Sequence, residues 1–143
     1  MGKSFNPWRI RDVGDGNTGW VQGRLVGDPP LVAPISKRRC FHYNAFVADK
    51  VATATVDELT IEDETGRALV VMAGAVIQLD FDHGREGILG PGELIAAYGT
   101  CRWERDPAPT RHGLYRDGPP QRLRITGTSR VRLWVSEDVP GRI

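Results

Sequence analysis

Apolar and polar residues alternate along several short stretches of the chain, and turn residues separate one stretch from the next. The clearest two stretches, residues 59–61 and 69–71, place apolar side chains at every second position. Each can therefore bury one face of a strand. The stretches lie on either side of an acidic turn. Period-two alternation in short runs, without a sustained period near 3.6, predicts an all-β protein organised around this hairpin.

The turn of this hairpin is the densest local signal in the sequence. Asp63 and Thr65 carry short polar side chains that can bond to nearby backbone amides, and Gly66 can adopt the positive φ of a tight turn. We expect the turn to organise the fold; its alternative role is a contact surface for a basic partner segment. Its residues are Glu62, Asp63, Glu64, Thr65, Gly66 and Arg67.

Further strands are predicted on both sides of the hairpin, at residues 20–26, 40–48, 93–103, 122–126 and 131–135. Gly23 lies inside the first of them and predicts a bulge or a sharp bend, which barrels use to turn corners. Residues 51–56 either continue the second strand or form the other arm of a hairpin. Residues 73–79 are a short helix or a strand, with a strand favoured for their latter half. Residues 80–92 and 104–120 are expected to be loops.

These elements predict a small β-barrel with long loops and at most one short helix. The barrel domain spans residues 20–136, after an N-terminal arm at residues 1–19 and before a tail at residues 137–143. Phe5 and Trp8 are candidates to pin the arm to the barrel. A β-sandwich is left open by the pattern alone. The 143 residues suffice for one domain with a real core, and 17 glycines and 10 prolines favour short strands joined by turns.

Charge is distributed unevenly, although the formal net charge is only +1. Residues 1–39 carry 7 basic and 3 acidic side chains, residues 40–101 carry 3 and 10, and residues 102–132 carry 8 and 3. In a barrel these blocks either neutralise one another or leave a basic binding face. The chain is 40% hydrophobic and 26% charged, as ordinary globular proteins are.

The two cysteines, Cys40 and Cys101, lie in apolar stretches, where a free thiol behaves as a small buried hydrophobe. Two cysteines without a secretion signal predict a reduced, cytoplasmic protein. No stretch approaches the ~18 apolar residues of a membrane span.

Candidate catalytic and metal-binding residues are few and scattered. There is no strained nucleophile turn and no base placed near an acid, so we expect no enzymatic activity. The possible metal ligands lack the paired spacing of zinc sites and the calcium-loop pattern, so no metal or cofactor is expected. The residues considered are Ser36, Cys40, His42 and His112 for catalysis, and Cys40, His42, Asp80, Asp82 and His83 for a metal.

Arginines and aromatic residues interleave between residues 102 and 134. OB-type barrels bind single-stranded nucleic acid through positive grooves and aromatic stacking platforms, and this region has both ingredients. Glu104, Asp106 and Asp117 dilute the charge, and a pI near 7.8 is low for a nucleic-acid binder. The candidate partner-binding residues are Arg102, Trp103, Arg105, Arg111, Tyr115, Arg116 and Trp134.

Several motifs follow one another along the chain: Val21-x-Gly23, residues 34–43, residues 61–70, Gly92-Glu93-Leu94 with Tyr98-Gly99, residues 115–120, residues 123–126 and residues 133–136. Taken in that order, they resemble the GIDE-type domain of membrane-anchored mitochondrial ubiquitin ligases and of bacterial membrane proteins. The resemblance covers about residues 20–136 and implies an OB-like β-barrel. The ligases also carry a RING, which needs eight Cys and His ligands, whereas this chain has two Cys and three His. Ubiquitin-ligase activity is therefore not expected.

Three functions follow as hypotheses. The first is a non-catalytic, GIDE-like protein- or peptide-binding module that uses the 104–120 loop or an exposed strand edge. The second is OB-type binding of single-stranded nucleic acid through residues 102–134, which would weaken strongly with added salt. The third is a structural subunit of a membrane-associated assembly.

Overall fold

The computed structural model describes residues 6–79, 85–107 and 120–137, and most of these residues are in β-strands. The one helical element among them is a single 3₁₀ turn, η1 (Ile10–Asp12). The strands are β1 (Thr18–Val26), β2 (Leu31–Val32), β3 (Arg39–Cys40), β4 (His42–Val47), β5 (Lys50–Thr55), β6 (Glu58–Asp63), β7 (Gly66–Val71), β8 (Val76–Gln78), β9 (Glu86–Leu89), β10 (Leu94–Arg105), β11 (Gln121–Thr126) and β12 (Trp134–Ser136).

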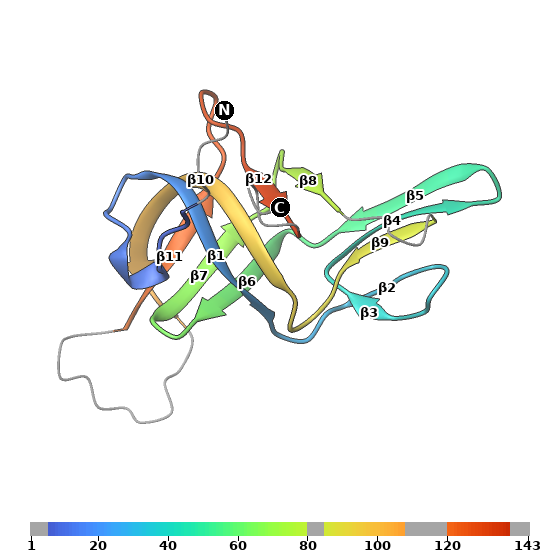
Figure 1. Cartoon of the computed structure of the whole chain (residues 1–143), viewed down its shortest axis with the longest axis horizontal. Coiled ribbons are helices and arrows are strands. Elements are labelled where there is room, and N and C mark those ends of the chain that lie inside the picture. The colour runs from blue at the N-terminus through green and yellow to red at the C-terminus, as the bar shows by residue number, and fades with distance from the viewer. Residues whose placement is uncertain (1–5, 80–84, 108–119, 138–143) are drawn as a thin grey trace.

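Five strands close into a barrel (Figure 1). Their order is β1–β6–β7–β11–β10, and β10 pairs back with β1 to complete the ring. The pair β7–β11 is parallel, and the other pairs of the ring are antiparallel. The prediction of a small all-β barrel is confirmed, and the ring of pairings rules out a two-sheet sandwich.

Strand β1 closes the barrel because it serves two partners. Residues 18–24 pair with β10, whereas residues 24–26 pair with β6. Gly23 lies where the partner changes, and its lack of a side chain lets the strands approach closely. A Cβ atom there would lie 3.0 Å from the carbonyl oxygen of Glu62 and 3.1 Å from the Cβ of Ile61. The absence of a side chain at Gly23 is thus required by the close approach of the strands, whereas the bulge or bend expected there stays a prediction.

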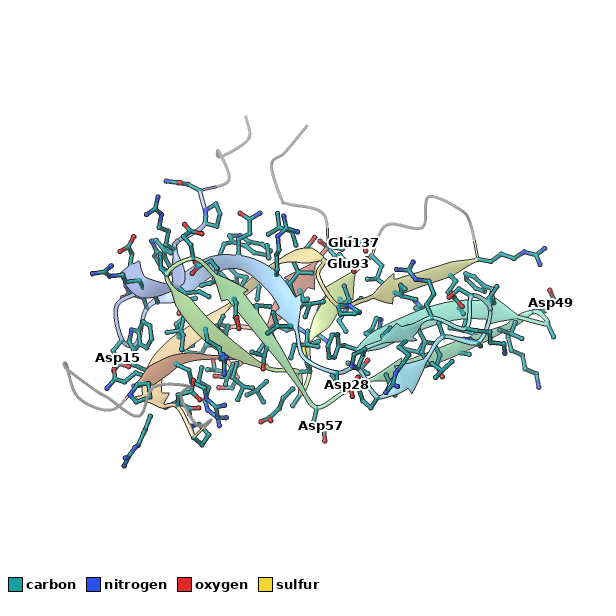
Figure 2. All side chains as sticks on the ribbon, turned by 90° about the horizontal axis from the view of Figure 1, so that it is seen from below. Asp15, Asp28, Asp49, Asp57, Glu93 and Glu137 are labelled. Atoms are coloured by element: carbon teal, nitrogen blue, oxygen red, sulfur yellow. The ribbon has the colours of Figure 1, made fainter. Side chains whose placement is uncertain are left out.

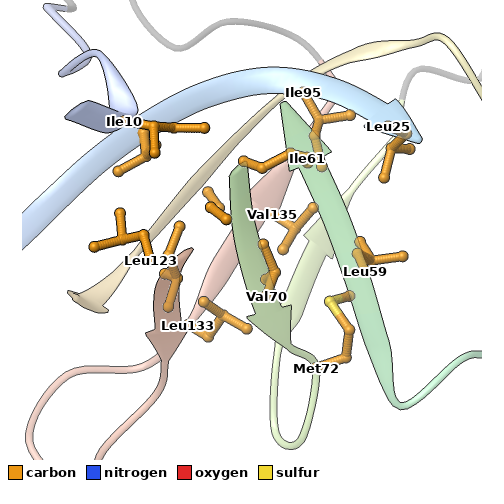
Figure 3. Close-up of a cluster of buried hydrophobic side chains, with 14 of the residues drawn as sticks. Ile10, Leu25, Leu59, Ile61, Val70, Met72, Ile95, Leu123, Leu133 and Val135 are labelled. Carbon is orange, nitrogen blue, oxygen red and sulfur yellow. The ribbon is translucent and has the colours of Figure 1, made fainter. Parts of the chain in front are cut away.

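The barrel interior is filled by aliphatic side chains from all of its strands (Figure 3). Each fully buried aliphatic residue contributes roughly 1.5–3 kcal/mol of transfer free energy. Ile10 and Val13, from the predicted arm, are 0% and 3% exposed and belong to this core. Trp8 also packs against it, and its N–H donates to the carbonyl oxygen of Trp20 at 3.0 Å. The expectation that Trp8 pins the arm is confirmed.

A lobe projects from the barrel, built by the chain between β1 and β6 together with β9, which comes later in the sequence (Figures 1 and 2). It contains the two-stranded sheet β2–β3 and the three-stranded sheet β5–β4–β9. Asp49 marks its tip, far from the barrel (Figure 2). The Glu86 carboxylate accepts hydrogen bonds from the backbone N–H of Ile35 (2.7 Å) and Ser36 (3.2 Å), which fastens the β2–β3 turn to β9.

Several predicted elements change at this level of detail. The loop expected at residues 80–92 contains β9, and the single strand expected at residues 40–48 divides into β3 and β4. Residues 51–56 form the returning arm of a hairpin, which was one of the two alternatives. The strand favoured in the latter half of residues 73–79 is confirmed as β8, and residues 131–135 contribute only the start of β12.

Candidate interaction surfaces

The acidic turn between β6 and β7 is a hydrogen-bonding centre. Asp63 Oδ1 accepts bonds from Thr65 N (2.7 Å), Thr65 Oγ1 (2.6 Å) and Gly66 N (3.0 Å). Its other oxygen accepts a bond from Ile10 N at 2.8 Å, so that one carboxylate closes the turn and fastens the N-terminal arm. Burial alone would raise the pKa of Asp63, but the bonds from Thr65, Ile10 and Gly66 outweigh it and hold that pKa below its usual value.

Gly66 does not have the positive φ that the sequence suggested, and that prediction is wrong. The described glycines with positive φ are Gly16, Gly27, Gly74 and Gly92. The Asp63 carboxylate closes the turn without a left-handed residue. A side chain at Gly66 would instead meet the arm, because a Cβ atom there would lie 3.2 Å from Ile10 Cγ2.

The charges of this turn are matched by basic groups of the same chain. Arg67 lies 3.4 Å from Glu62 and 3.8 Å from Asp106, and Arg9 lies 3.8 Å from Glu64. A cleft of about 480 Å³ beside the turn is lined by residues of both signs, including Arg9, Glu62 and Glu64. The turn is therefore poorly suited to attract a basic segment through charge alone.

The arginines of β11 are neutralised in a similar way. Arg122 and Arg124 both direct Nε at the Glu104 carboxylate on β10, the second at 2.6 Å. Burial of Glu104 would raise its pKa, but these two guanidinium groups hold the pKa below its usual value. Two arginines of the basic block 102–132 are thus paired with an acidic residue of the same block, which reduces the positive potential available to a polyanion.

The predicted partner-binding residues of β10 fall into two groups. Trp103 packs against the core, and its Nε1–H donates to the carbonyl oxygen of Val13 at 2.7 Å. Its backbone N–H donates to Asp15 Oδ1, also at 2.7 Å, so this tryptophan holds the loop before β1. Arg102 and Arg105 are exposed. The predicted residues Arg111, Tyr115 and Arg116, and the candidates Asp80, Asp82, His83 and His112, lie outside the described residues.

Trp134, the last predicted partner-binding residue, belongs to an aromatic row on the outside of the barrel. Trp20 on β1 is opposite Tyr98 on β10, and Tyr98 is opposite Trp134 on β12. The rings of Trp20 and Tyr98 lie 5.3 Å apart, and Trp134 is 36% exposed. Two residues further along β10, Thr18 is opposite Thr100 and their hydroxyl oxygens are 3.3 Å apart. The structure therefore places Trp134 with aromatic partners that the sequence did not associate with it.

Cys40 and His42, two of the residues considered for catalysis, are buried, and so is Cys101. Burial raises the pKa of the Cys101 thiol to about 11, and burial is also the main reason that the pKa of Cys40 is raised. The His42 Nδ1 atom is hydrogen-bonded to Thr55 Oγ1 at 2.6 Å, and burial lowers the pKa of this histidine. Among the described residues, no group of three or more His, Cys, Asp and Glu side chains could hold a metal ion.

Three of the five large apolar side chains that are exposed on the described part of the lobe lie at its tip, and the other two, Val32 and Ile35, lie on β2 and in the turn after it. Phe46, Val47 and Val51 are 51%, 41% and 61% exposed. Phe46 is directly opposite Val51 in the β4–β5 ladder, so these two side chains lie on the same face. The turn that joins the strands consists of Ala48 and Asp49, which have φ of 50° and 63°. Two positive φ values are typical of a type I′ hairpin, which glycine or asparagine usually occupies.

Strand β5 forms the border of the three-stranded sheet (Figure 1). The N–H of Phe46 donates to Arg85 O at 2.9 Å, away from β5. Because backbone groups point alternately to the two sides of a strand, it is residues 43, 45 and 47 of β4 that bond to β5, through residues 54, 52 and 50. The Val56 N–H donates to Phe41 O, so residue 56 also bonds toward the β4 side, as residues 50, 52 and 54 do.

The backbone groups of the alternate residues, Val51, Thr53 and Thr55, consequently point outward. No strand pairs with this side of β5 in the residues that the structure describes. All three residues have exposed side chains on one face of the sheet, next to Phe46. The sequence predicted binding at an exposed strand edge without saying which strand, and β5 is the candidate for that edge. Its signal was present in the stretch Lys50–Thr55, which alternates β-branched residues with alanine and carries one charge.

Comparisons of the chain with protein-family models, with curated proteins and with solved structures gave no match. Across the described ranges, none of the helical structure is long and apolar enough to span a membrane.

Proposed function

We propose that the protein is a non-catalytic binding module that takes up an extended segment of a partner polypeptide as an added strand on β5. The observation that carries this proposal is the open edge of β5, with outward-pointing backbone groups at Val51, Thr53 and Thr55. An exposed edge with low charge is a template for strand addition unless it is protected. The single edge charge, Lys50, stands at the end of the strand.

The edge offers both affinity and selectivity. Three N–H groups and three C=O groups can bond to an incoming strand, and each such bond contributes roughly 0.5–1.5 kcal/mol net. Side chains then decide which segment binds. The exposed Phe46 and Val51 would favour an apolar residue at the partner position nearest the lobe tip.

The motifs that resemble the GIDE-type domain fit this proposal. In such ligases the resembling barrel is the part outside the RING, which would contact a partner, and binding at a strand edge needs no catalytic group. We further propose that the module acts in the cytoplasm, since both of its cysteines are free and buried.

A displayed library of random seven-residue peptides tests the proposal. Selected peptides are expected to bind wild type and to lose at least tenfold in affinity on Thr53→Pro, because proline removes an outward N–H and leaves the backbone hydrogen bonds between β5 and β4 in place. The side-chain bond from Thr53 Oγ1 to Asn44 Oδ1 on β4 is lost in Thr53→Pro and in Thr53→Val alike. Thr53→Val is the matched control, since it keeps the N–H and the β-propensity, and it should bind as wild type does. A library that yields no peptide sensitive to Thr53→Pro would refute strand addition. Circular dichroism must show that both variants are folded.

The aromatic row supports a second candidate function, OB-type binding of single-stranded nucleic acid. The ring order with a parallel β7–β11 pair is consistent with an OB-type barrel. Bases could stack on Trp134 and Tyr98, and Arg102 is exposed on the outer side of β10, beyond Thr100. Fluorescence anisotropy with a labelled thymidine oligonucleotide at low salt tests this function. Trp134→Ala should weaken binding by ~1–3 kcal/mol, and no detectable binding by wild type would eliminate this candidate.

A further inference from the structure

We infer that the strand accepted by β5 is β5 of a second copy of the chain, so that the lobes of two molecules form one continuous sheet. This inference rests on the proposed strand addition and names its partner. It is carried by the symmetry of the open edge, in which the outward-pointing residues Val51 and Thr55 lie at equal distances on either side of Thr53.

A two-fold axis perpendicular to the sheet at Thr53 satisfies every outward backbone group. Antiparallel pairing of the two β5 strands would put Thr53 opposite Thr53 of the second copy, and Val51 opposite Thr55 of the second copy. Each of these positions is of the hydrogen-bonded type, in which two facing residues exchange both N–H···O bonds. Three such pairs give about six hydrogen bonds. In any other register, some outward N–H and C=O groups of one β5 strand would extend past the end of the second β5 strand and stay unpaired.

The side chains are compatible with this pairing on both faces. Val51 would adjoin a β-branched threonine, and the two Thr53 side chains would meet at the axis, which is a favourable cross-strand pair. On the other face only the small Ala52 and Ala54 would be opposed. A two-fold axis perpendicular to the sheet keeps the exposed face of one lobe continuous with the same face of the other. Phe46 and Val51 of both copies would therefore lie on one surface.

Charge favours the same register. Lys50 would lie opposite Val56 of the second copy, one residue from the exposed Asp57, and the two-fold axis repeats this proximity of opposite charges. The two Lys50 side chains would be separated by about six residue steps, or roughly 20 Å, so they do not repel strongly. The partner chemistry that β5 recognises best is thus its own sequence.

The predicted interface is short, and its strength follows from its length. Five paired residues per copy would bury less than the ~1,200 Å² typical of stable complexes. We therefore expect a reversible dimer whose population rises with protein concentration, rather than a permanent one.

Site-specific disulfide formation tests the register directly. In Thr53→Cys the two introduced thiols would face each other with Cα atoms about 5.5 Å apart, within the range that a disulfide bridges. In the control Val51→Cys the equivalent thiols would lie about 14 Å apart, four residue steps along the strand. Cys40 and Cys101 are buried and contribute little background. Under mild oxidation, Thr53→Cys is expected to form dimers at least tenfold faster than Val51→Cys.

Equal rates for the two variants would overturn the inference, because they would report random collision. Sedimentation equilibrium then provides an independent readout. The average mass of wild type should rise from one toward two chains with concentration, and Thr53→Pro should stay at one chain while Thr53→Val follows wild type. A wild-type mass of one chain at every concentration would reject self-pairing but leave peptide addition, which the peptide library tests separately. If neither self-association nor a peptide sensitive to Thr53→Pro is found, the open-edge function is rejected as a whole.

Discussion

Removal of the Asp63 carboxylate should loosen the barrel at two places at once. Asp63→Ala deletes the acceptor of four hydrogen bonds, three from Thr65 and Gly66 within the turn and one from Ile10 in the arm. A hydrogen bond to a charged group contributes roughly 1.5–3 kcal/mol, and bonds that share one acceptor are not additive. Since the turn is partly exposed, water replaces some of the lost partners. We expect the free energy of unfolding to fall by about 2–4 kcal/mol.

Urea denaturation followed by tryptophan fluorescence measures this change. Glu64→Ala is the matched control, because Glu64 lies in the same turn, is exposed, and forms a long ion pair with Arg9 at 3.8 Å. Its unfolding free energy should stay within about 0.5 kcal/mol of wild type. If Asp63→Ala were as stable as Glu64→Ala, the carboxylate would not be the centre of the turn, and the account of how the arm is attached would be wrong.

Four further expectations follow. Gly23→Val should destabilise the fold by about 2 kcal/mol or more, because the new Cβ would collide with β6 backbone, and Gly23→Ala should cost less in the same urea titration. Trp103→Phe should lose about 1 kcal/mol from the missing bond to Val13, and limited proteolysis should then cleave residues 6–19 faster. Ala48→Gly should raise the melting temperature, since a left-handed alanine costs roughly 1 kcal/mol; an unchanged or lower value would argue against the type I′ turn. Acid titration should lower stability as pH falls below about 4.5, because carboxylates with folded pKa values below their unfolded values stabilise the fold only while ionised. Those groups are Asp63, Glu86 and Glu104.

The sequence was sufficient to predict the barrel because its strands carry local signals. Period-two alternation around residues 59–71, and the turn chemistry of Asp63, both act over a few residues and need no knowledge of distant partners. A glycine inside a predicted strand likewise marked position 23 as unusual. The reason that a side chain does not fit there, the backbone of Glu62, lies on another strand.

The features that were missed depend on contacts between distant residues. Strand β9 exists because it pairs with β4, more than forty positions earlier, and its own stretch is rich in glycine. Gly66 was assigned a positive φ because a turn glycine usually has one, whereas the contact that restricts it comes from Ile10 in the arm. Sequence alone also could not show that β5 is a border strand, since that follows from which strands the sheet contains.

Hydrogen exchange of the backbone amides of β5 tests the central claim most directly. At low protein concentration, the amides of Ala52 and Ala54, which face β4, should be protected, while those of Val51, Thr53 and Thr55 should exchange freely. At high concentration, or with a selected peptide, the second group should become protected while the first changes little. Equal protection of all five amides at the lowest concentration, or continued free exchange of Thr53 when the partner is bound, would contradict an open edge that accepts a strand.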